Sequence, residues 1–276
     1  MRKLLVSTFL ILLLAACGEG NGPLVEKIEN EGRVVYDLNT GKRYTGKVRR
    51  VATNRDGNKY VHIESNYRAG KLHGDYTEYY GNGKVKRKGK LRNGKAEGFW
   101  MIYNEKGVIR HVVEYENGKK VNLQKEYYDN ENLRLEQYYY QGLLEGRTKF
   151  YYPTGALQEE GEYKDNRKTG LWTQYYLNGA LKIKGNFFEG FQNGLWEEYY
   201  PDGKLRISMN FKMDKIDGEM KKYFPAGGLE IEGEFRESFP RGLWRIYNEA
   251  GQLIREEDWE KTLSKVMTEA DEDQPD

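Results

Sequence analysis

The sequence has few of the residues that build enclosed chemical sites. Its single cysteine, Cys17, allows no disulfide within the chain. Its three histidines, His62, His73 and His111, match no metal-ligand spacing. No nucleophile has a candidate histidine and acid partner, and no glycine-rich phosphate loop precedes a helix. These absences predict a protein that is not an enzyme and that uses no metal and no cofactor.

Long hydrophobic runs are also scarce, and the clearest one lies at the amino terminus. Arg2 and Lys3 precede 11 mostly apolar residues (4–14), too few to span a bilayer as a helix. Residues 14–17 read Leu-Ala-Ala-Cys and are followed by Gly18, which resembles the bacterial lipobox. The resemblance implies a signal peptide over 1–16, cleavage before Cys17 and a lipid on its sulfur, with residues 17–23 as a tether. It also implies a lipoprotein of the cell envelope, held on the outer membrane if the cell has one.

The most informative feature of the chain is a repeat of 24 residues, which restarts eight times from Gly74. The opening residues are Gly74, Gly98, Asn122, Gly146, Gly170, Gly194, Gly218 and Gly242. We number repeat positions from these residues. A period of this size indicates one supersecondary unit stacked on copies of itself, each too small to bury its apolar face alone.

Three columns of the repeat carry aromatic or aliphatic side chains. Position 6 is always tyrosine: Tyr79, Tyr103, Tyr127, Tyr151, Tyr175, Tyr199, Tyr223 and Tyr247. Position 12 is always aliphatic, and position 18 is aromatic in all copies but one. Position 3 holds tryptophan in four copies: Trp100, Trp172, Trp196 and Trp244. We expect the regular tyrosine column to form the structural core of the repeats. The irregular tryptophan column is the candidate for binding a partner.

Turn signals divide each repeat into two strands. Position 10 is glycine in seven copies, usually after a small or polar residue, as in Asn82-Gly83, and a second turn falls near position 21, as in Asn93-Gly94. Between the turns, apolar and polar residues alternate with the period of a strand. We therefore predict an all-β protein, an elongated single-layer antiparallel β-meander of stacked 24-residue hairpins over 74–259. Glycines at position 16 (Gly89, Gly161, Gly185 and Gly233) would let an aromatic ring lie across a neighbour's bare backbone.

The two ends of the array depart from the pattern. Residues 24–73 are interpreted as an opening segment and an atypical first repeat. Residues 260–276 are interpreted as a short capping helix followed by an acidic tail, because Trp259, Leu263, Val266 and Met267 have helical spacing. The repeat that opens at Asn122 has Glu131 in place of the turn glycine, so a bend or bulge is expected there.

The repeat motif Gly-Leu-Trp-x-x-Tyr-Tyr-x-Asn-Gly-x-Leu resembles the MORN-repeat variant family. Residues 67–74 and 194–203 carry the resemblance most clearly, and it covers about 44–259. It implies a β-meander used for protein or lipid contact, with no catalytic residues. Some bacterial members of that family are labelled as antitoxins of toxin–antitoxin systems.

Three hypotheses follow for the function. The leading one is a non-catalytic, membrane-anchored scaffold that binds a protein partner at the cell envelope, because Trp and Tyr concentrate binding energy. The second is a cell-wall glycan- or choline-binding protein, which would need three rings converging between adjacent repeats rather than a row. The third is an antitoxin or immunity protein. Because an exported lipoprotein rarely meets nucleic acid, none is expected as a partner.

Overall fold

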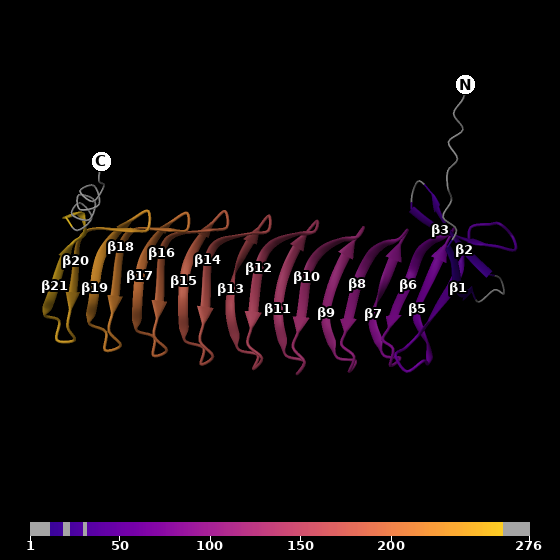
Figure 1. The fold of residues 1–276 in the computed structure, drawn as a ribbon, viewed down its shortest axis with the longest axis horizontal. Helices are drawn as coiled ribbons and strands as arrows, with labels where there is room; N and C mark the ends of the chain where they lie inside the picture. The colour runs from indigo at the N-terminus through magenta and orange to yellow at the C-terminus, as the bar shows by residue number, and fades with distance from the viewer. Residues whose placement is uncertain (1–11, 19–22, 30–31, 262–276) are drawn as a thin grey trace, which may run out of the picture. The chain divides into compact units, whose positions relative to one another are not determined.

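The computed structural model describes residues 12–18, 23–29 and 32–261, with side chains from Val34 onward. Figure 1 labels the strands, and the chain divides into two compact units. Unit 1 comprises residues 1–133 and 139–143, and unit 2 comprises residues 134–138 and 144–276. Strand β11 (Leu133–Tyr140) contributes residues to both units.

Unit 1 is built from ten further strands. They are β1 (Leu12–Gly18), β2 (Pro23–Glu29), β3 (Gly32–Asp37), β4 (Gly46–Thr53), β5 (Lys59–Arg68), β6 (Lys71–Tyr79), β7 (Val85–Arg92), β8 (Lys95–Tyr103), β9 (Ile109–Glu116) and β10 (Lys119–Tyr127). From β4 to β10 each strand pairs antiparallel with the next strand of the chain. This is a meander, as the repeat predicted.

Unit 2 continues the same pattern with its own ten strands. They are β12 (Leu143–Tyr151), β13 (Leu157–Lys164), β14 (Arg167–Tyr175), β15 (Leu181–Phe188), β16 (Phe191–Tyr199), β17 (Leu205–Lys212), β18 (Lys215–Tyr223), β19 (Leu229–Arg236), β20 (Phe239–Tyr247) and β21 (Leu253–Asp258). Each pairs antiparallel with its successor. The prediction of an antiparallel β-meander of 24-residue hairpins is confirmed.

Backbone conformation explains the turn residues. In the second turn Asn93 and Gly94 both have positive φ, 50° and 82°, which matches the right-handed twist of the flanking strands. At the first turn Gly83 has a φ of 80°. Glu131 has a φ of 68° at the equivalent position, so this turn keeps its conformation without glycine. A non-glycine residue is uncommon at positive φ.

Neighbouring repeats are also joined through their turns. In each unit the amide of position 21 donates to the carbonyl of position 23 in the preceding repeat. Examples are Gly118 to Ala96 at 2.8 Å and Gly190 to Lys168 at 2.9 Å. These bonds add to the strand ladders, so every repeat holds the next one at its edge as well as along its strands.

The first strands form the only cluster of fully buried apolar side chains in the part of the chain described here. Val35, Tyr44, Val48 and Tyr67 pack together. Strand β1 pairs with β2 and β4. Most of β1 belongs to the predicted signal peptide, and the predicted tether includes the end of β1 and the first residue of β2. Cleavage before Cys17 stays a prediction.

A short helix begins at Trp259 and is described as far as Lys261. The Asp258 carboxylate caps it, accepting hydrogen bonds from the amides of Glu260 at 3.2 Å and Lys261 at 3.4 Å. The remainder of the predicted capping helix and the acidic tail lie outside the described residues. Among the described residues no helix is long and apolar enough to cross a membrane.

Candidate functional site

Each of the four tryptophans lies flat on a glycine of the preceding repeat. The pairs are Trp100 on Gly89, Trp172 on Gly161, Trp196 on Gly185 and Trp244 on Gly233. A Cβ on any of these glycines would lie only 2.1–2.4 Å from the nearest indole atom, far inside van der Waals contact. The glycine is therefore the seat of the ring, and the tryptophan column belongs to the packing of one repeat on another.

Hydrogen bonds fix the orientation of three of these four rings. The indole N–H of Trp100 donates to the carbonyl of Lys90 at 3.1 Å, and that of Trp172 donates to Glu162 at 3.2 Å. Trp196 makes the equivalent bond to Asn186 at 3.1 Å. In each case the acceptor follows the glycine that carries the ring. These three side chains are thus held at both their apolar face and their polar edge, whereas the buried indole nitrogen of Trp244 has no hydrogen-bond partner.

Burial differs along the tryptophan column. Trp100 is 8% exposed and Trp172 is 3% exposed, so neither has much surface to offer a partner. Trp196 and Trp244 are half-buried, and every residue from 186 to 261 is at least partly exposed. The role of these four residues in partner binding stays a prediction.

The rings in unit 2 form a row. Tyr163, Trp172, Phe187, Trp196 and Phe211 follow one another edge to face, with successive centroids 5.3, 6.0, 5.2 and 5.8 Å apart. This geometry is the favourable one for aromatic pairs and adds about 0.5–1.5 kcal/mol per pair to area burial. The side of the sheet that carries this row is called the tryptophan face below.

A lysine covers one ring of that row. The Lys168 ammonium lies 3.7 Å from the Trp172 ring centroid and 5.1 Å from that of Phe187. It also donates to Glu159 at 2.9 Å. The Lys168 ammonium therefore interacts with both an aromatic ring and a carboxylate of the protein itself.

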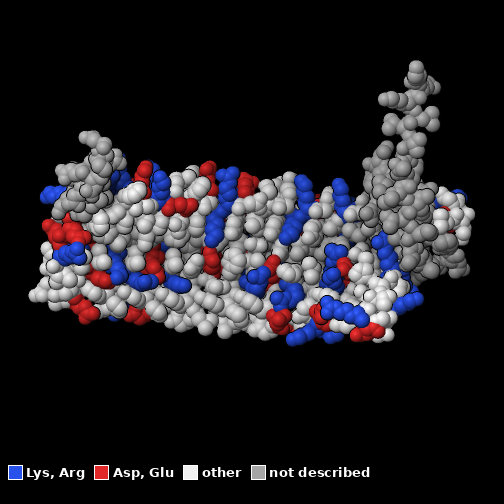
Figure 2. All heavy atoms as spheres, in the orientation of Figure 1, with Lys and Arg blue, Asp and Glu red and all other residues white. Residues whose placement is uncertain are grey.

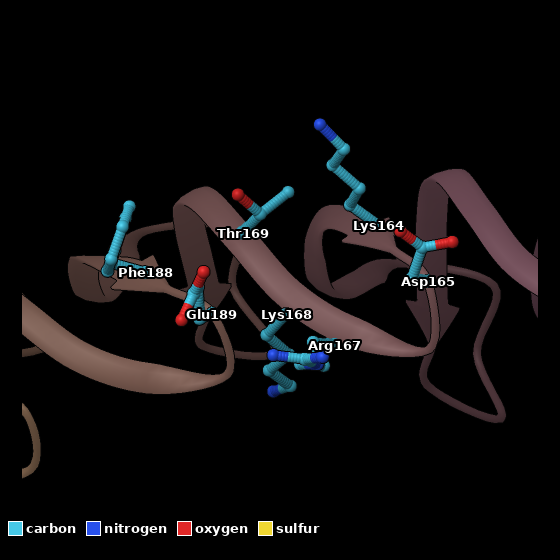
Figure 3. Close-up of a pocket in the computed structure, with 7 residues that line it drawn as sticks. All are labelled: Lys164, Asp165, Arg167, Lys168, Thr169, Phe188 and Glu189. Carbon is cyan, nitrogen blue, oxygen red and sulfur yellow. The ribbon is translucent and has the colours of Figure 1, made fainter.

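A shallow pocket of about 260 Å³ lies beside Lys168, between two successive second turns (Figure 3). Its lining residues are Lys164, Asp165, Arg167, Lys168, Thr169, Phe188 and Glu189. Lys164 and Phe188 point to one side of the turns and Arg167 and Lys168 to the other. Charged groups of both signs line an open surface here, and the described residues hold no group of three or more potential metal ligands.

The hydroxyl groups of the tyrosine column bond to carboxylates, in four cases on the preceding repeat and in the case of Tyr199 within its own strand. Five members donate to a carboxylate at 2.8–3.1 Å: Tyr79 to Glu64, Tyr151 to Glu136, Tyr175 to Glu160, Tyr199 to Glu197 and Tyr247 to Glu232. Burial, together with the hydrogen bond to Glu136, raises the pKa of Tyr151 to about 12. These phenols are structural hydrogen-bond donors.

A second tyrosine, at position 7, bonds in the opposite direction along the chain. Its hydroxyl donates to the carbonyl of position 6 in the following repeat, at 2.7–2.8 Å. The pairs are Tyr80 with Tyr103, Tyr152 with Tyr175, Tyr176 with Tyr199, and Tyr200 with Tyr223. In the repeats that open at Gly74, Gly146 and Gly170, the Tyr-Tyr doublet thus ties the repeat to both of its neighbours. Sequence reasoning found the first tyrosine and missed the role of the second.

The opposite side of the sheet presents apolar side chains to solvent. They occupy position 2, immediately before the tryptophan column, and alternation along the strand turns them away from the tryptophan face. Phe99 is 59% exposed, Leu171 54%, Leu195 48% and Leu243 40%. We call Leu171, Leu195 and Leu243, which all belong to unit 2, the leucine row. Strand alternation next to each tryptophan was the signal that could have found it.

Basic and acidic side chains are interspersed over the view in Figure 2. Several of them form ion pairs. The strongest local arrangement is at Glu78, which is buried and accepts from Lys86 at 2.8 Å and Arg87 at 2.6 Å. Burial alone would raise the pKa of Glu78, but the two hydrogen-bonded cations outweigh it and lower the pKa. This carboxylate is a fixed structural anion.

The comparisons with known proteins identify the repeat. Five segments match the family model described as "MORN repeat variant": residues 72–93, 144–165, 168–188, 192–213 and 216–237. No curated protein matches. A solved structure described as "Crystal Structure of TcdB2-TccC3-Cdc42" aligns at 13% identity and a TM-score of 0.19, over 83% of this chain and 16% of that chain. The five matched repeats and the open meander are typical of a non-enzymatic repeat scaffold.

Proposed function

We propose that this protein is a non-catalytic scaffold, anchored to a bacterial membrane by lipid on Cys17, that binds a protein partner at the cell envelope. The observation that carries the proposal is the leucine row of unit 2, Leu171, Leu195 and Leu243, which exposes large apolar side chains on the face opposite the tryptophans. Repeat scaffolds characteristically bind through such extended surfaces.

Folding does not require apolar residues at position 2. The same column holds Asp75, Arg147 and Glu219 in other repeats, and those repeats form the same pair of strands. The repeat therefore forms its two strands without a leucine at this position. Because the leucines of the row are already about half covered, burying the remainder against a partner would contribute about half of the roughly 1.5–3 kcal/mol of a fully buried side chain. Binding is the simplest reason for its presence.

The choline- and glycan-binding alternative has less support. Its sites would need three rings that converge on a ligand, whereas Tyr163, Trp172 and Phe187 follow one another in a row. At Trp172 the cationic position is already filled by Lys168. The antitoxin alternative draws on no particular residue of the fold.

Affinity capture of the membrane-anchored protein from its own envelope tests the scaffold proposal. The variant Leu171→Glu/Leu195→Glu should lose a stoichiometric protein that the native chain retains. The control is Leu177→Glu, because Leu177 is 57% exposed but lies in a turn outside the row. Equal capture by all three proteins would reject the leucine row as the binding surface.

The membrane anchor is tested separately. Cells fed labelled palmitate should transfer label to the native protein and none to Cys17→Ser, and the native protein should fractionate with membranes. An unlabelled native chain that retains residues 1–16 would refute the anchor without affecting the binding surface.

A further inference from the structure

Position 2 in unit 2 carries a fixed order of side chains on one face. Along the chain these are Arg147, Leu171, Leu195, Glu219 and Leu243. All five are exposed. They occupy equivalent places in β12, β14, β16, β18 and β20, as the common register with the following strand establishes. The order is basic, apolar, apolar, acidic, apolar.

The spacing of this column limits which polypeptide can follow it. Consecutive members lie two strands apart, a distance of about 9.6 Å. In an α-helix residues i and i+7 share one side and are about 10.5 Å apart. In a β-strand the same-side spacings are about 6.7 or 13 Å, and neither fits. A helix laid along the column meets successive members at seven-residue intervals, with a mismatch of about 0.9 Å and a rotation of about 20° at each step.

We propose that this column docks an amphipathic α-helix of the partner protein, read at seven-residue intervals. The helix presents an acidic residue to Arg147, apolar residues to Leu171 and Leu195, a basic residue to Glu219 and an apolar residue to Leu243. This proposal rests on the proposed scaffold function and specifies the chemistry of its partner. The two charges set the direction of the helix, because reversing it would oppose like charges.

A depression in the surface beside the column could accommodate side chains of the docked helix. A depression of about 440 Å³ lies between Arg147 and Leu171, with Glu160, Thr173 and Tyr175 among its lining residues. It offers side chains of a helix a place between consecutive members of the column. Glu219 is 67% exposed and has Lys221 at 3.0 Å, so its carboxylate can accept a further cation from outside.

The direct test uses two synthetic helical peptides and the full-length protein in lipid nanodiscs. One peptide carries Glu, Leu, Leu, Lys and Leu at seven-residue intervals in a neutral helical background. The other exchanges its Glu and Lys. Fluorescence anisotropy should give about tenfold tighter binding for the first, an effect within reach of two exposed ion pairs changed to repulsions.

A charge-reversed protein provides the decisive control. The variant Arg147→Glu/Glu219→Lys should exchange the preference for the two peptides, and circular dichroism should establish that it remains folded. Equal affinity for both peptides, or an unchanged preference in the variant, would overturn the helix proposal.

The failure of this proposal is distinguishable from that of the scaffold. If neither peptide binds while Leu171→Glu/Leu195→Glu still abolishes capture of a partner, the helix proposal is wrong and the leucine row remains a binding surface. Binding of a proline-rich peptide with the same charges at three-residue intervals would replace the helix by a polyproline II segment, whose repeat is about 9.3 Å.

Discussion

The indole of Trp172 lies against the backbone of Gly161, so closely that a Cβ at residue 161 would be 2.2 Å from the ring atom Cδ2. The same contact recurs wherever position 3 is tryptophan. Where position 16 carries a side chain instead, the following repeat has no tryptophan: Val113 precedes Gln124, Gln137 precedes Thr148 and Met209 precedes Met220. Glycine and tryptophan therefore form one structural unit shared by two repeats.

Gly161→Ala should destabilise the protein by about 1–3 kcal/mol, because the added methyl must displace a packed ring. Urea unfolding followed by tryptophan fluorescence measures the change. The matched control is Gly228→Ala, since nothing lies within 4 Å of a Cβ at residue 228 and its φ is not positive. Similar losses in both variants would contradict the ring-seat interpretation.

The same contact predicts strong coupling between the two residues. Gly161→Val and Trp172→Gln should each destabilise, the second by about 3–5 kcal/mol as for other losses of a buried tryptophan. The double variant recreates the native pair Val113 and Gln124. We expect its loss of unfolding free energy to fall short of the sum of the single losses by more than about 1 kcal/mol. Additive losses would show that the residues act independently.

The position 7 hydroxyl can be removed in one repeat and added in another. Tyr200→Phe deletes the hydrogen bond to the Tyr223 carbonyl and should cost about 0.5–1.5 kcal/mol. Phe224 occupies the same position in the next repeat, so Phe224→Tyr should stabilise by a similar amount. Thermal unfolding of both variants measures the effects. Changes of the same sign would refute the role assigned to this hydroxyl.

The phenol of Tyr151 should titrate late and couple to stability at high pH. Its pKa is raised from 10 to about 12 by burial and by the hydrogen bond to Glu136. The neutral form is thus favoured in the folded protein, so its contribution to stability is complete below pH 10 and is lost as the pH rises through 12.

Ultraviolet difference titration of the native protein against Tyr151→Phe should isolate one phenolate with a midpoint near pH 12. The variant should also lose less stability than the native protein between pH 10 and 12. Tyr140→Phe controls for removing a hydroxyl, because Tyr140 is 64% exposed, and at neutral pH it should unfold at the native temperature. A Tyr151 midpoint near 10 would contradict the prediction.

Much of the fold could be read from the sequence because its signals are local. Asn-Gly pairs such as Asn93-Gly94 specify tight turns, and alternating residues between them specify strands. The 24-residue period then implies that the hairpins stack. The glycine seat for an aromatic ring was also predicted, since a ring needs a bare backbone beneath it. The lipid on Cys17 stays a prediction that the fold does not test.

The candidate site was less accessible to sequence reasoning. Alternation along the strand predicts that Leu171 and Trp172 face opposite sides of the sheet. It does not predict on which side the side chains of neighbouring repeats pack together. Tryptophan is enriched at binding hot spots, which directed attention to Trp172 rather than to Leu171 beside it. Burial of Trp172 at 3% and exposure of Leu171 at 54% emerge only when neighbouring strands are in place.

By itself the sequence determined the period, the positions of the strands and turns, and the pairing of tryptophan with glycine, because each depends on residues close in the chain or one repeat apart. Tertiary structure alone decided which face is packed and which is open, and which acceptors the two tyrosines reach. Those outcomes depend on how strands pair and on the register shift beside each position 6 tyrosine, as between Gln174 and Tyr175. Such shifts reorient side chains without altering the pattern of residues.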